Sequence, residues 1–407
     1  MDLQKEFKTI DKLDWDFRSG SGNYGVHTYH WFPAKFTPQI PSILITLLSK
    51  RGDTVIDPFC GSGSTIVEAL RLGRKTIGID SNPLACLISR VKVTPISPKY
   101  IKERASLLRL RLNHIHQEVN FQRLTQKALM SELNSEVEAT FDSPLNKWFS
   151  SYTLLQIRII LSAILEEKDS TVRNFFLVCL SDRLRFTSSQ DRWSRHWGYI
   201  ADNVYPKNLK DINAFEEFLN HLEQMIKGNS EFIDECRRNQ ISEEEIRSKC
   251  MVYEGNAENI CQIIEDGQTD LIVTSPPYPG AVDYTNANRL SFYLLGYDLQ
   301  KSKLNEIGAR IYRGRRNFLF EYEDKMFTCL TRFYESLADE GHLALVLPDK
   351  IDVARLEVLE RLIDRSQREV DFRLEKTISR KISHQITGAR SITHEKIYIF
   401  SKRKSKF

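Results

Sequence analysis

A short run of residues, Ser275-Pro276-Pro277-Tyr278, combines a hydroxyl group, two rigid prolines and an aromatic ring directly after an apolar segment. Consecutive prolines fix two φ angles and remove two N–H donors, so the backbone there is stiff and offers carbonyl acceptors. A hydroxyl and a carbonyl held together accept both hydrogens of an –NH2 group, which aims the nitrogen lone pair at an electrophile. A following aromatic ring provides a face on which a planar base stacks. The pattern therefore favours chemistry on an exocyclic amine.

A second candidate site is the glycine-rich loop that runs from Asp57 to Thr65, after the apolar segment Thr54–Asp57. Its glycines allow a sharp turn and close approach of a ligand at the carboxyl end of a strand. The dinucleotide fingerprint fails because Ile66 stands where a third small residue is needed, and the Gly-Lys-Ser/Thr of a phosphate-binding loop is absent. Asp57 suits a cationic ligand, and Asp80, which ends the next apolar segment, is placed to bind ribose hydroxyls. S-adenosylmethionine, with its amine and sulfonium, is such a ligand.

Together the two motifs resemble those of the amino-methylating (N4-cytosine type) S-adenosylmethionine-dependent DNA methyltransferases. That family has a loop of the form Asp-Pro-Phe-x-Gly-x-Gly-Thr, with Ser64 in place of the threonine here, and a Ser-Pro-Pro-Tyr motif. The resemblance implies transfer of a methyl group to the N4 amino group of a cytosine flipped out of double-stranded DNA. Ser275 and the carbonyl of Pro276 would hold the amino group, Pro277 would stiffen the turn, and Tyr278 would stack on the base.

The same resemblance implies contacts to S-adenosyl-L-methionine. Asn256, after the segment that precedes the catalytic one, would contact the adenine. His30–Phe36 is similar to the family element His-x-x-Pro-Ala-Lys-Phe, which covers the methionine end of the cofactor. The implied cofactor-binding residues are Asp57, Phe59, Gly61, Gly63, Asp80, Asn256, Pro33, Lys35 and Phe36.

The pattern of apolar segments predicts an α/β fold with a doubly wound, mostly parallel sheet, and the resemblance implies the seven-stranded methyltransferase type. A strand, a loop, a helix and a second strand within residues 54–80 form a βαβ unit. Strand patterns return at 251–253, 270–273, 342–347 and 396–400, and helical periodicity dominates between them and the first unit. We expect a cofactor-capping segment (1–50), a cofactor-binding half (51–96), a mostly helical insertion that contacts DNA (97–250) and a catalytic half (251–407).

Three basic stretches are candidates for DNA contact. Residues 299–320 hold six Lys/Arg and one acid, residues 373–407 hold ten Lys/Arg and two acids, and residues 181–199 combine arginines with two tryptophans. Basic groups interleaved with aromatic rings suit phosphate contact and stacking, although a solvated charged surface has the same composition. We expect 181–199 and 299–320 to flank the duplex. The residues singled out are Arg192, Trp193, Arg195, Arg313, Arg315 and Arg316.

Composition excludes several other classes of function. The seven cysteines form no CxxC pair, which argues against a disulfide framework and a structural zinc site, and no metal is expected. None follows a proline, so the Pro-Cys nucleophile of carbon-5 cytosine methylation is missing. The first residues lack a secretory pattern and no apolar stretch approaches the ~20 residues of a membrane span. A DNA-associated cytoplasmic protein of a bacterial or archaeal cell is expected, with no membrane partner.

Three alternatives remain open at this point. Adenine-N6 methylation of DNA uses the same chemistry, usually with Asp or Asn in the place of Ser275. An RNA amino-methyltransferase shares the loop at Asp57, and a non-catalytic DNA-binding subunit shares the fold. The family mostly serves restriction–modification, which implies a cognate restriction endonuclease that acts separately.

Overall fold

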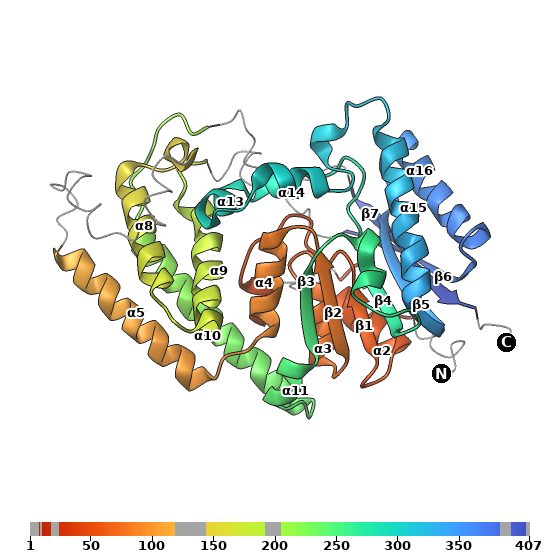
Figure 1. The fold of residues 1–407 in the computed structure, drawn as a ribbon, viewed down its shortest axis with the longest axis horizontal. Helices are drawn as coiled ribbons and strands as arrows, with labels where there is room; N and C mark the ends of the chain where they lie inside the picture. Colours follow the sequence, from red (N-terminus) through yellow and green to blue (C-terminus); the bar gives the residue numbers. More distant parts are fainter. Residues whose placement is uncertain are drawn as a thin grey trace.

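A single seven-stranded sheet forms the centre of the protein (Figure 1). The computed structural model describes residues 8, 10–17, 24–118, 144–191, 205–382 and 392–403. The strand order is β3-β2-β1-β4-β5-β7-β6; β7 is antiparallel to both of its neighbours and the other pairs are parallel. The strands are β1 Thr54–Asp57, β2 Lys75–Asp80, β3 Cys250–Glu254, β4 Thr269–Thr274, β5 Leu337–Pro348, β6 Phe372–Lys381 and β7 His394–Lys402. The predicted α/β class with a doubly wound, mostly parallel sheet is confirmed.

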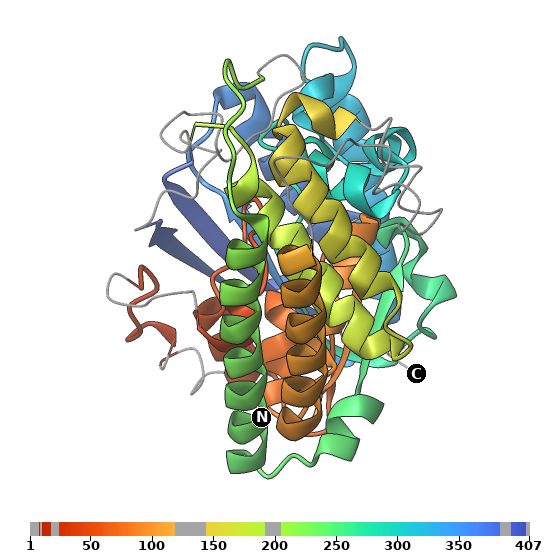
Figure 2. The same cartoon turned by 90° about the vertical axis from the view of Figure 1, so that its left-hand side faces the viewer.

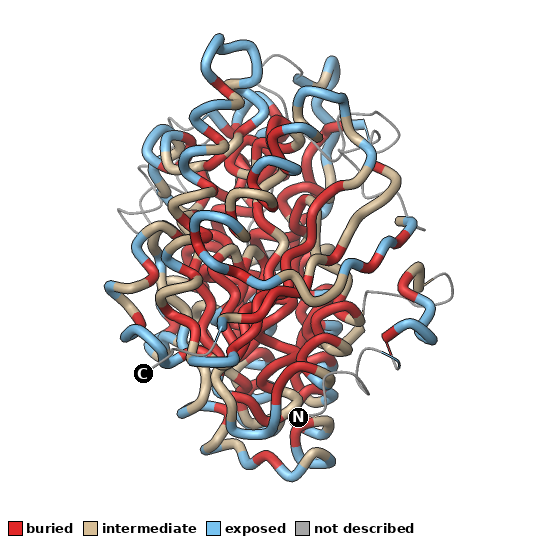
Figure 3. Tube along the Cα trace, turned by 90° about the vertical axis from the view of Figure 1, so that its right-hand side faces the viewer, coloured by how far each residue is buried: buried red, intermediate tan, exposed pale blue. Residues whose placement is uncertain are grey.

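Both faces of the sheet are covered, which explains why its central strands are apolar at nearly every position. Successive side chains of a strand point to opposite faces. In β4, Ile272 accordingly packs with one hydrophobic cluster, and Leu271 and Val273 pack with another. Helix α2 (Gln39–Leu48) belongs to the cluster of Leu271, whereas α15 (Phe318–Ser336) and α16 (Val353–Arg368) belong to the cluster of Ile272. Figure 3 shows the buried chain concentrated between these layers.

The chain between β2 and β3 is helical in its described parts. Helices α5, α8 and α10 run side by side (Figure 2). They share a hydrophobic cluster with α3 and α4, the helices next to β1 and β2, so they form an added layer on the α/β unit and not a separate core. These helices are α3 Ser64–Arg71, α4 Pro83–Val93, α5 Pro98–Glu118, α8 Ser151–Leu165, α9 Ser170–Thr187, α10 Ala214–Arg238 and α11 Glu243–Ser248.

Short helices follow β4 and lie over one end of the sheet (Figure 1). They are α12 Tyr284–Ala287, α13 Arg289–Leu295 and α14 Leu299–Asn305. The 3-10 helices are η1 Gly25–Thr28, η2 Pro144–Lys147, η3 Ala257–Gln262 and η4 Arg310–Tyr312. Among the described residues, no helix has both the length and the apolar character to cross a membrane.

Two strands differ from expectation. Strand β6 was not predicted, because five of its ten residues are charged and it lies at the sheet edge. Strand β5 begins at Leu337, five positions before the predicted start at His342. Asp339 and Glu340 lie near the beginning of this strand. The pairing of β5 with β4 shifts register between Thr269 and Leu271. A bulge of this kind hides the two-residue period from sequence patterns.

Candidate active site

The loops at the carboxyl ends of β1, β2, β3 and β4 line one cleft, which we name the Asp57 cleft. Its empty volume, including its open mouth, is about 890 Å³. The described lining includes Pro33, Lys35, Phe36, Asp57, Phe59, Gly61, Asp80, Asn256, Ser275 and Pro277. Parallel strands bring their carboxyl ends to the same edge of a sheet, and ligands bind there in this class of fold. The fold thus gathers at one place residues separated by more than 200 positions in the chain.

Asp57 is a buried acid of this cleft, and hydrogen bonds from two segments of the chain hold its side chain in place. The backbone N–H of Phe59 donates to its Oδ1 at 3.1 Å, and the hydroxyl of Thr274 donates to the same oxygen at 2.7 Å. Burial raises the pKa of Asp57 to about 6, while these hydrogen bonds oppose the rise by favouring the charged form. Because Thr274 ends β4, its bond to Asp57 joins the glycine loop to the strand that leads to Ser275.

Asp80 joins the glycine loop to β2. Its Oδ2 accepts from the backbone N–H of Gly61 at 2.8 Å, and its Oδ1 accepts from the N–H of Asn82 at 2.9 Å. Burial also raises the pKa of Asp80 to about 6. The carboxylate therefore stiffens the loop and faces the cleft at the same time.

Gly63 has a packing role. Its φ is +82°, and a Cβ there would lie 2.8 Å from the hydroxyl oxygen of Ser89 in α4. Only glycine satisfies both the left-handed backbone and the close contact. Gly63 does not line the Asp57 cleft, in contrast to Gly61.

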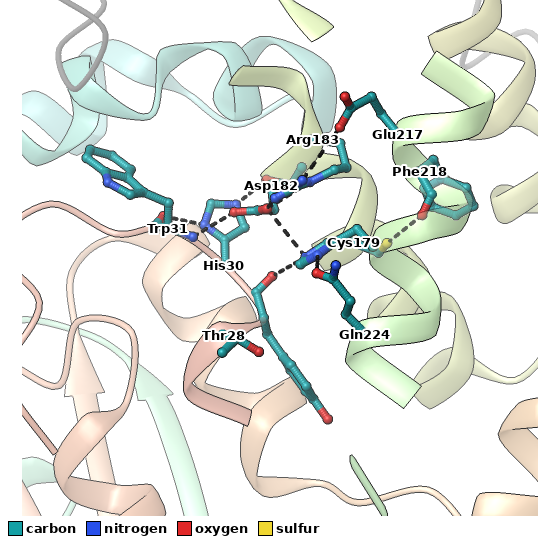
Figure 4. A network of polar contacts seen from close by, with 12 residues as sticks. Thr28, His30, Trp31, Cys179, Asp182, Arg183, Glu217, Phe218 and Gln224 are labelled. Atoms are coloured by element: carbon teal, nitrogen blue, oxygen red, sulfur yellow. Dashed lines mark hydrogen bonds and ion pairs between the residues drawn. The ribbon is translucent and has the colours of Figure 1, made fainter. Parts of the chain in front are cut away.

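The segment from His30 to Phe36 covers the cleft and is anchored to α9 and α10 in the helical layer (Figure 4). A ring nitrogen of His30 lies 2.9 Å from the hydroxyl of Ser181, and the N–H of Trp31 donates to Asp182 at 2.7 Å. His221 of α10 contacts the carbonyl of Tyr29 at 3.0 Å. The helical layer therefore fixes where this covering segment lies.

Lys35 contributes a charged side chain to the covering segment. Its ammonium group donates to the carbonyl of His27. Burial lowers the pKa of Lys35 to about 8, which the negative charge of Asp182 opposes. Lys35 and Phe36 line the Asp57 cleft together with Pro33.

A second hollow, which we name the Tyr278 cavity, adjoins the first. It is lined by Ser275, Pro276 and Tyr278, and by residues of α9, β6 and β7. Its empty volume, open solvent included, is about 2050 Å³. Ser275 lines both hollows, so the loop that follows β4 lies between them.

The turn after Ser275 is fixed by contacts from the following segments. The hydroxyl of Tyr322 donates to the carbonyl of Pro277 at 3.0 Å. The N–H of Gly280 donates to the carbonyl of Gly308 at 2.8 Å, and a Cβ on Gly308 would lie 2.7 Å from the Tyr322 ring. These bonds add to the stiffness that the two prolines provide.

The basic residues fall into two groups. Arg192, Trp193 and Arg195 lie outside the described residues. Arg313, Arg315 and Arg316 are exposed, and the Cγ and Cδ of Arg313 lie 3.3 Å from where a Cβ on Gly280 would stand. The segment 299–320 therefore borders the loop that follows Tyr278.

Sequence reasoning missed three residues of the Asp57 cleft. Phe32 and Tyr284 stack with ring centroids 5.9 Å apart and line both hollows. Glu306 follows α14, accepts a hydrogen bond from the N–H of Thr285, and has a pKa that burial raises to about 7. Phe32 stood within the covering motif, but no local pattern distinguishes Glu306 from other surface acids.

The cleft fits a positively charged nucleoside. Three carboxylates, those of Asp57, Asp80 and Glu306, face a hollow whose walls include the Phe32 and Tyr284 rings. Carboxylates attract an amine and a sulfonium and accept hydrogen bonds from ribose hydroxyls, and the rings offer faces to a purine. This donor set agrees with S-adenosyl-L-methionine and disfavours a phosphate.

The fold and this cleft define an S-adenosyl-L-methionine-dependent methyltransferase. A protein-family model described as DNA methylase matches residues 3–90. The chain is 26% identical over 330 residues to the Type II methyltransferase M.MvaI of Kocuria varians, covering 76% of this chain and 68% of the relative. It is 24% identical over 435 residues to the Type II methyltransferase M.MjaII of Methanocaldococcus jannaschii, covering 86% and 78%. Among solved structures, the rRNA methyltransferase aviRa of Streptomyces viridochromogenes superposes with a TM-score of 0.36 at 10% identity, covering 94% of this chain and 91% of that one.

The chain is thus similar to Type II DNA methyltransferases over most of its length, and the DNA methylase family model matches its first part. It is an enzyme that uses S-adenosyl-L-methionine as its methyl donor.

Proposed function

We propose that the protein transfers a methyl group from S-adenosyl-L-methionine to the N4 amino group of cytosine at a specific site in double-stranded DNA. The observation that carries the proposal is the position of Ser275, which lines both the Asp57 cleft and the Tyr278 cavity. A residue at this junction meets the methyl donor on one side and the target amine on the other. In-line transfer needs such alignment, and positioning supplies most of the rate enhancement.

In this proposal the Asp57 cleft holds the cofactor, which supplies an electrophilic methyl group. Asp80 accepts hydrogen bonds from the ribose hydroxyls, Asn256 contacts the adenine, and Phe59 and Gly61 form the floor beneath them. Asp57 and Glu306 attract the cationic methionine end. Pro33, Lys35 and Phe36 cover it and exclude water.

The Tyr278 cavity receives the extruded base. Tyr278 stacks on the ring, and the hydroxyl of Ser275 and the carbonyl of Pro276 accept the two amine hydrogens. Serine favours cytosine over adenine in this role by its family resemblance, since the adenine-N6 enzymes usually carry Asp or Asn there. Flipping a base costs a few kcal/mol of unstacking, which the protein recovers through contacts with the base and the backbone.

Charged and aromatic groups at the cavity support DNA as the substrate. Arg183 and Phe186 of α9 line the Tyr278 cavity, and Arg313 borders the loop after Tyr278. Arg315 packs over the ring of Tyr312, with 3.9 Å between its guanidinium carbon and the ring centroid. We infer that the described part of 181–199 and the segment 299–320 flank the duplex. Each phosphate contact steepens the salt dependence of binding.

A charge-reversal variant tests this placement. Changing Arg313, Arg315 and Arg316 to Glu should flatten the dependence of DNA affinity on salt concentration, measured between about 50 and 200 mM. The matched control reverses Arg361, Arg365 and Arg368 on α16, which lie on a helix that does not line either hollow. Equal salt slopes for the two triple variants and the unaltered protein would disprove the placement.

Mass spectrometry of nucleosides tests the reaction itself. DNA incubated with the protein and the methyl donor should yield N4-methylcytosine, and sequencing of the modified DNA should place it at one recurring site. Finding N6-methyladenine instead would reassign the target base, and methylation of RNA alone would reject DNA as substrate.

We further propose that the enzyme is the modification partner of a restriction endonuclease that acts separately. An endonuclease that cuts the same site and is blocked by the methylation would support this.

The role of Ser275 has its own test. Ser275→Ala should lower the rate of methyl transfer by about a hundredfold or more, because Ser275 both positions the target amine and receives a proton from it. The dissociation constant of the cofactor should stay within about twofold, because the Asp57 contacts are unchanged. An equal loss of cofactor affinity and rate would show that Ser275 has another role.

A further inference from the structure

A chain of polar contacts leads away from Ser275 on the side of the Tyr278 cavity. The hydroxyl of Ser275 donates to the hydroxyl oxygen of Tyr278 at 3.2 Å. The hydroxyl of Tyr278 in turn donates to Oε1 of Glu395 at 2.8 Å. The other oxygen of Glu395, Oε2, lies 2.5 Å from the guanidinium of Arg380. Three residues separated by up to 120 positions are thereby placed in one line.

We propose that this line carries the proton released by the target amine from Ser275 through Tyr278 to Glu395. The proposal rests on the function proposed above and names residues for a step that it leaves open. Apart from the stacking role of Tyr278, both Tyr278 and Glu395 act on the amine through Ser275 and are in this respect positioning residues; Glu395 is also the end of the proton path.

The directions of these hydrogen bonds decide whether the Ser275 oxygen can accept hydrogens from the target amine. Because Ser275 donates its only hydrogen to Tyr278, the lone pairs of its oxygen remain as acceptors for the amine hydrogens. Glu395 fixes this direction, because the hydroxyl of Tyr278 donates its hydrogen to the carboxylate. The Tyr278 oxygen can then only accept from Ser275. A burial-raised pKa keeps Tyr278 in its neutral form, which both donates and accepts.

The step balances in protons and electrons. The nitrogen lone pair forms the new bond to the methyl carbon as the bond from that carbon to sulfur breaks, which leaves the amine positive. One amine proton then passes to the Ser275 oxygen, the Ser275 proton passes to the Tyr278 oxygen, and the Tyr278 proton passes to Oε1 of Glu395. Both hydroxyl groups are regenerated, and Glu395 ends neutral. Its proton returns to water through the Tyr278 cavity, whose wall includes Glu395.

Arg380 holds Glu395 in place without preventing this transfer. Arg380 is buried, with a side chain 5% exposed, and its Nε–H also donates to the carbonyl of Trp15 at 3.0 Å. An amine attached to an aromatic ring is a strong acid once it carries a positive charge, so it gives up its proton readily to a carboxylate.

Two variants and one matched control test the relay. Glu395→Gln keeps an acceptor for Tyr278 but removes the basic site, and Tyr278→Phe keeps the ring that stacks while cutting the path. The matched control is Glu375→Gln on β6, because Glu375 likewise accepts from a hydroxyl, that of Ser401 at 2.6 Å, and pairs with an arginine, Arg373. Its side chain is 13% exposed against 12% for Glu395, and it lines neither hollow.

Single-turnover methyl transfer with saturating cofactor and DNA is the measurement. Glu395→Gln and Tyr278→Phe should each slow transfer by about tenfold to a hundredfold, less than a full general base because water partly substitutes. The double variant should be no slower than the slower single variant, since both interrupt one path. Cofactor and DNA dissociation constants should stay within about twofold, and Glu375→Gln should match the unaltered protein.

Chemical rescue separates a proton acceptor from a structural contact. Glu395→Ala opens space beside Tyr278, so formate added in solution should restore much of its rate and none of the rate of Tyr278→Phe. Rates of Glu395→Gln and Tyr278→Phe equal to that of Glu375→Gln would overturn the relay and leave the proposed function standing. Absence of DNA methylation by the unaltered protein would instead reject the proposed function.

Discussion

Replacing Thr274 with valine removes a single hydroxyl group from beneath the cofactor cleft and keeps the branched shape of the side chain. That hydroxyl donates to Asp57 Oδ1 at 2.7 Å, and both residues are buried. A hydrogen bond to a charged group contributes about 1.5–3 kcal/mol, and 1.36 kcal/mol corresponds to one pKa unit. The pKa of Asp57, which burial raises to about 6, should therefore rise by a further one to two units, roughly, in the variant.

The consequence for cofactor binding has a defined pH window. Asp57 in the unaltered protein is about nine-tenths ionised at pH 7, whereas in Thr274→Val it is about half to one-tenth ionised. A cationic ligand binds the charged form, so the cofactor should bind about twofold to tenfold more weakly at pH 7. Near pH 9 both proteins carry the charge, and the affinities should converge.

Calorimetric titration with S-adenosyl-L-methionine from pH 5.5 to 9 measures this shift. The control is Thr269→Val at the other end of β4, because Thr269 is equally buried and its hydroxyl has no hydrogen-bond partner among the described residues. The midpoint of the affinity curve should move toward alkaline pH only in Thr274→Val. The reasoning is refuted if the two valine variants have the same midpoint, or if the weaker binding of Thr274→Val persists at pH 9.

Two further predictions concern the glycine loop and the cleft. Gly63→Ala should lower the free energy of unfolding by about 2–3 kcal/mol in urea denaturation, because it adds a contact at 2.8 Å with Ser89 to the strain of a φ of +82°. Gly267→Ala, with a φ of +73° and no atom within 4 Å, should cost about 1 kcal/mol, and equal losses would contradict the packing role. In the unaltered protein the cofactor affinity should rise as the pH increases through about 7, where Glu306 ionises. Glu306→Gln should remove this part of the rise. An unchanged rise above pH 6.5 in the same titration would show that Glu306 does not face the cationic end.

The sequence by itself determined the features that depend on neighbouring residues. Two consecutive prolines after an apolar segment define the stiff turn at Ser275 whatever surrounds it, because each ring fixes its own φ angle. Asp57 and Gly61 form a turn whose need for glycine is local, and Gly61 does adopt a positive φ of 50°. The apolar character of β1, β2 and β4 identified strands covered on both faces.

Strand β6 was not determined in this way. Its high content of charged residues is that of a solvated surface, and only pairing with β7 makes it a strand. The same holds for Glu306, which lies in no motif and reaches the cleft because α12 to α14 fold back over the carboxyl ends of the strands. Local propensity carries no record of such long-range pairing.

Tertiary structure alone decided how the site is completed. Thr274 meets Asp57 across 217 positions of the chain, Tyr278 meets Glu395 across 117, and Arg380 meets Trp15 across 365. The first two bonds exist because strands end or begin at one edge of the sheet, and the third exists because the N-terminal segment at Trp15 packs against β6. Hydrogen bonds depend on distances of about 3 Å between specific atoms, and the spacing of residues along a chain does not specify such distances once it exceeds a turn or a helix.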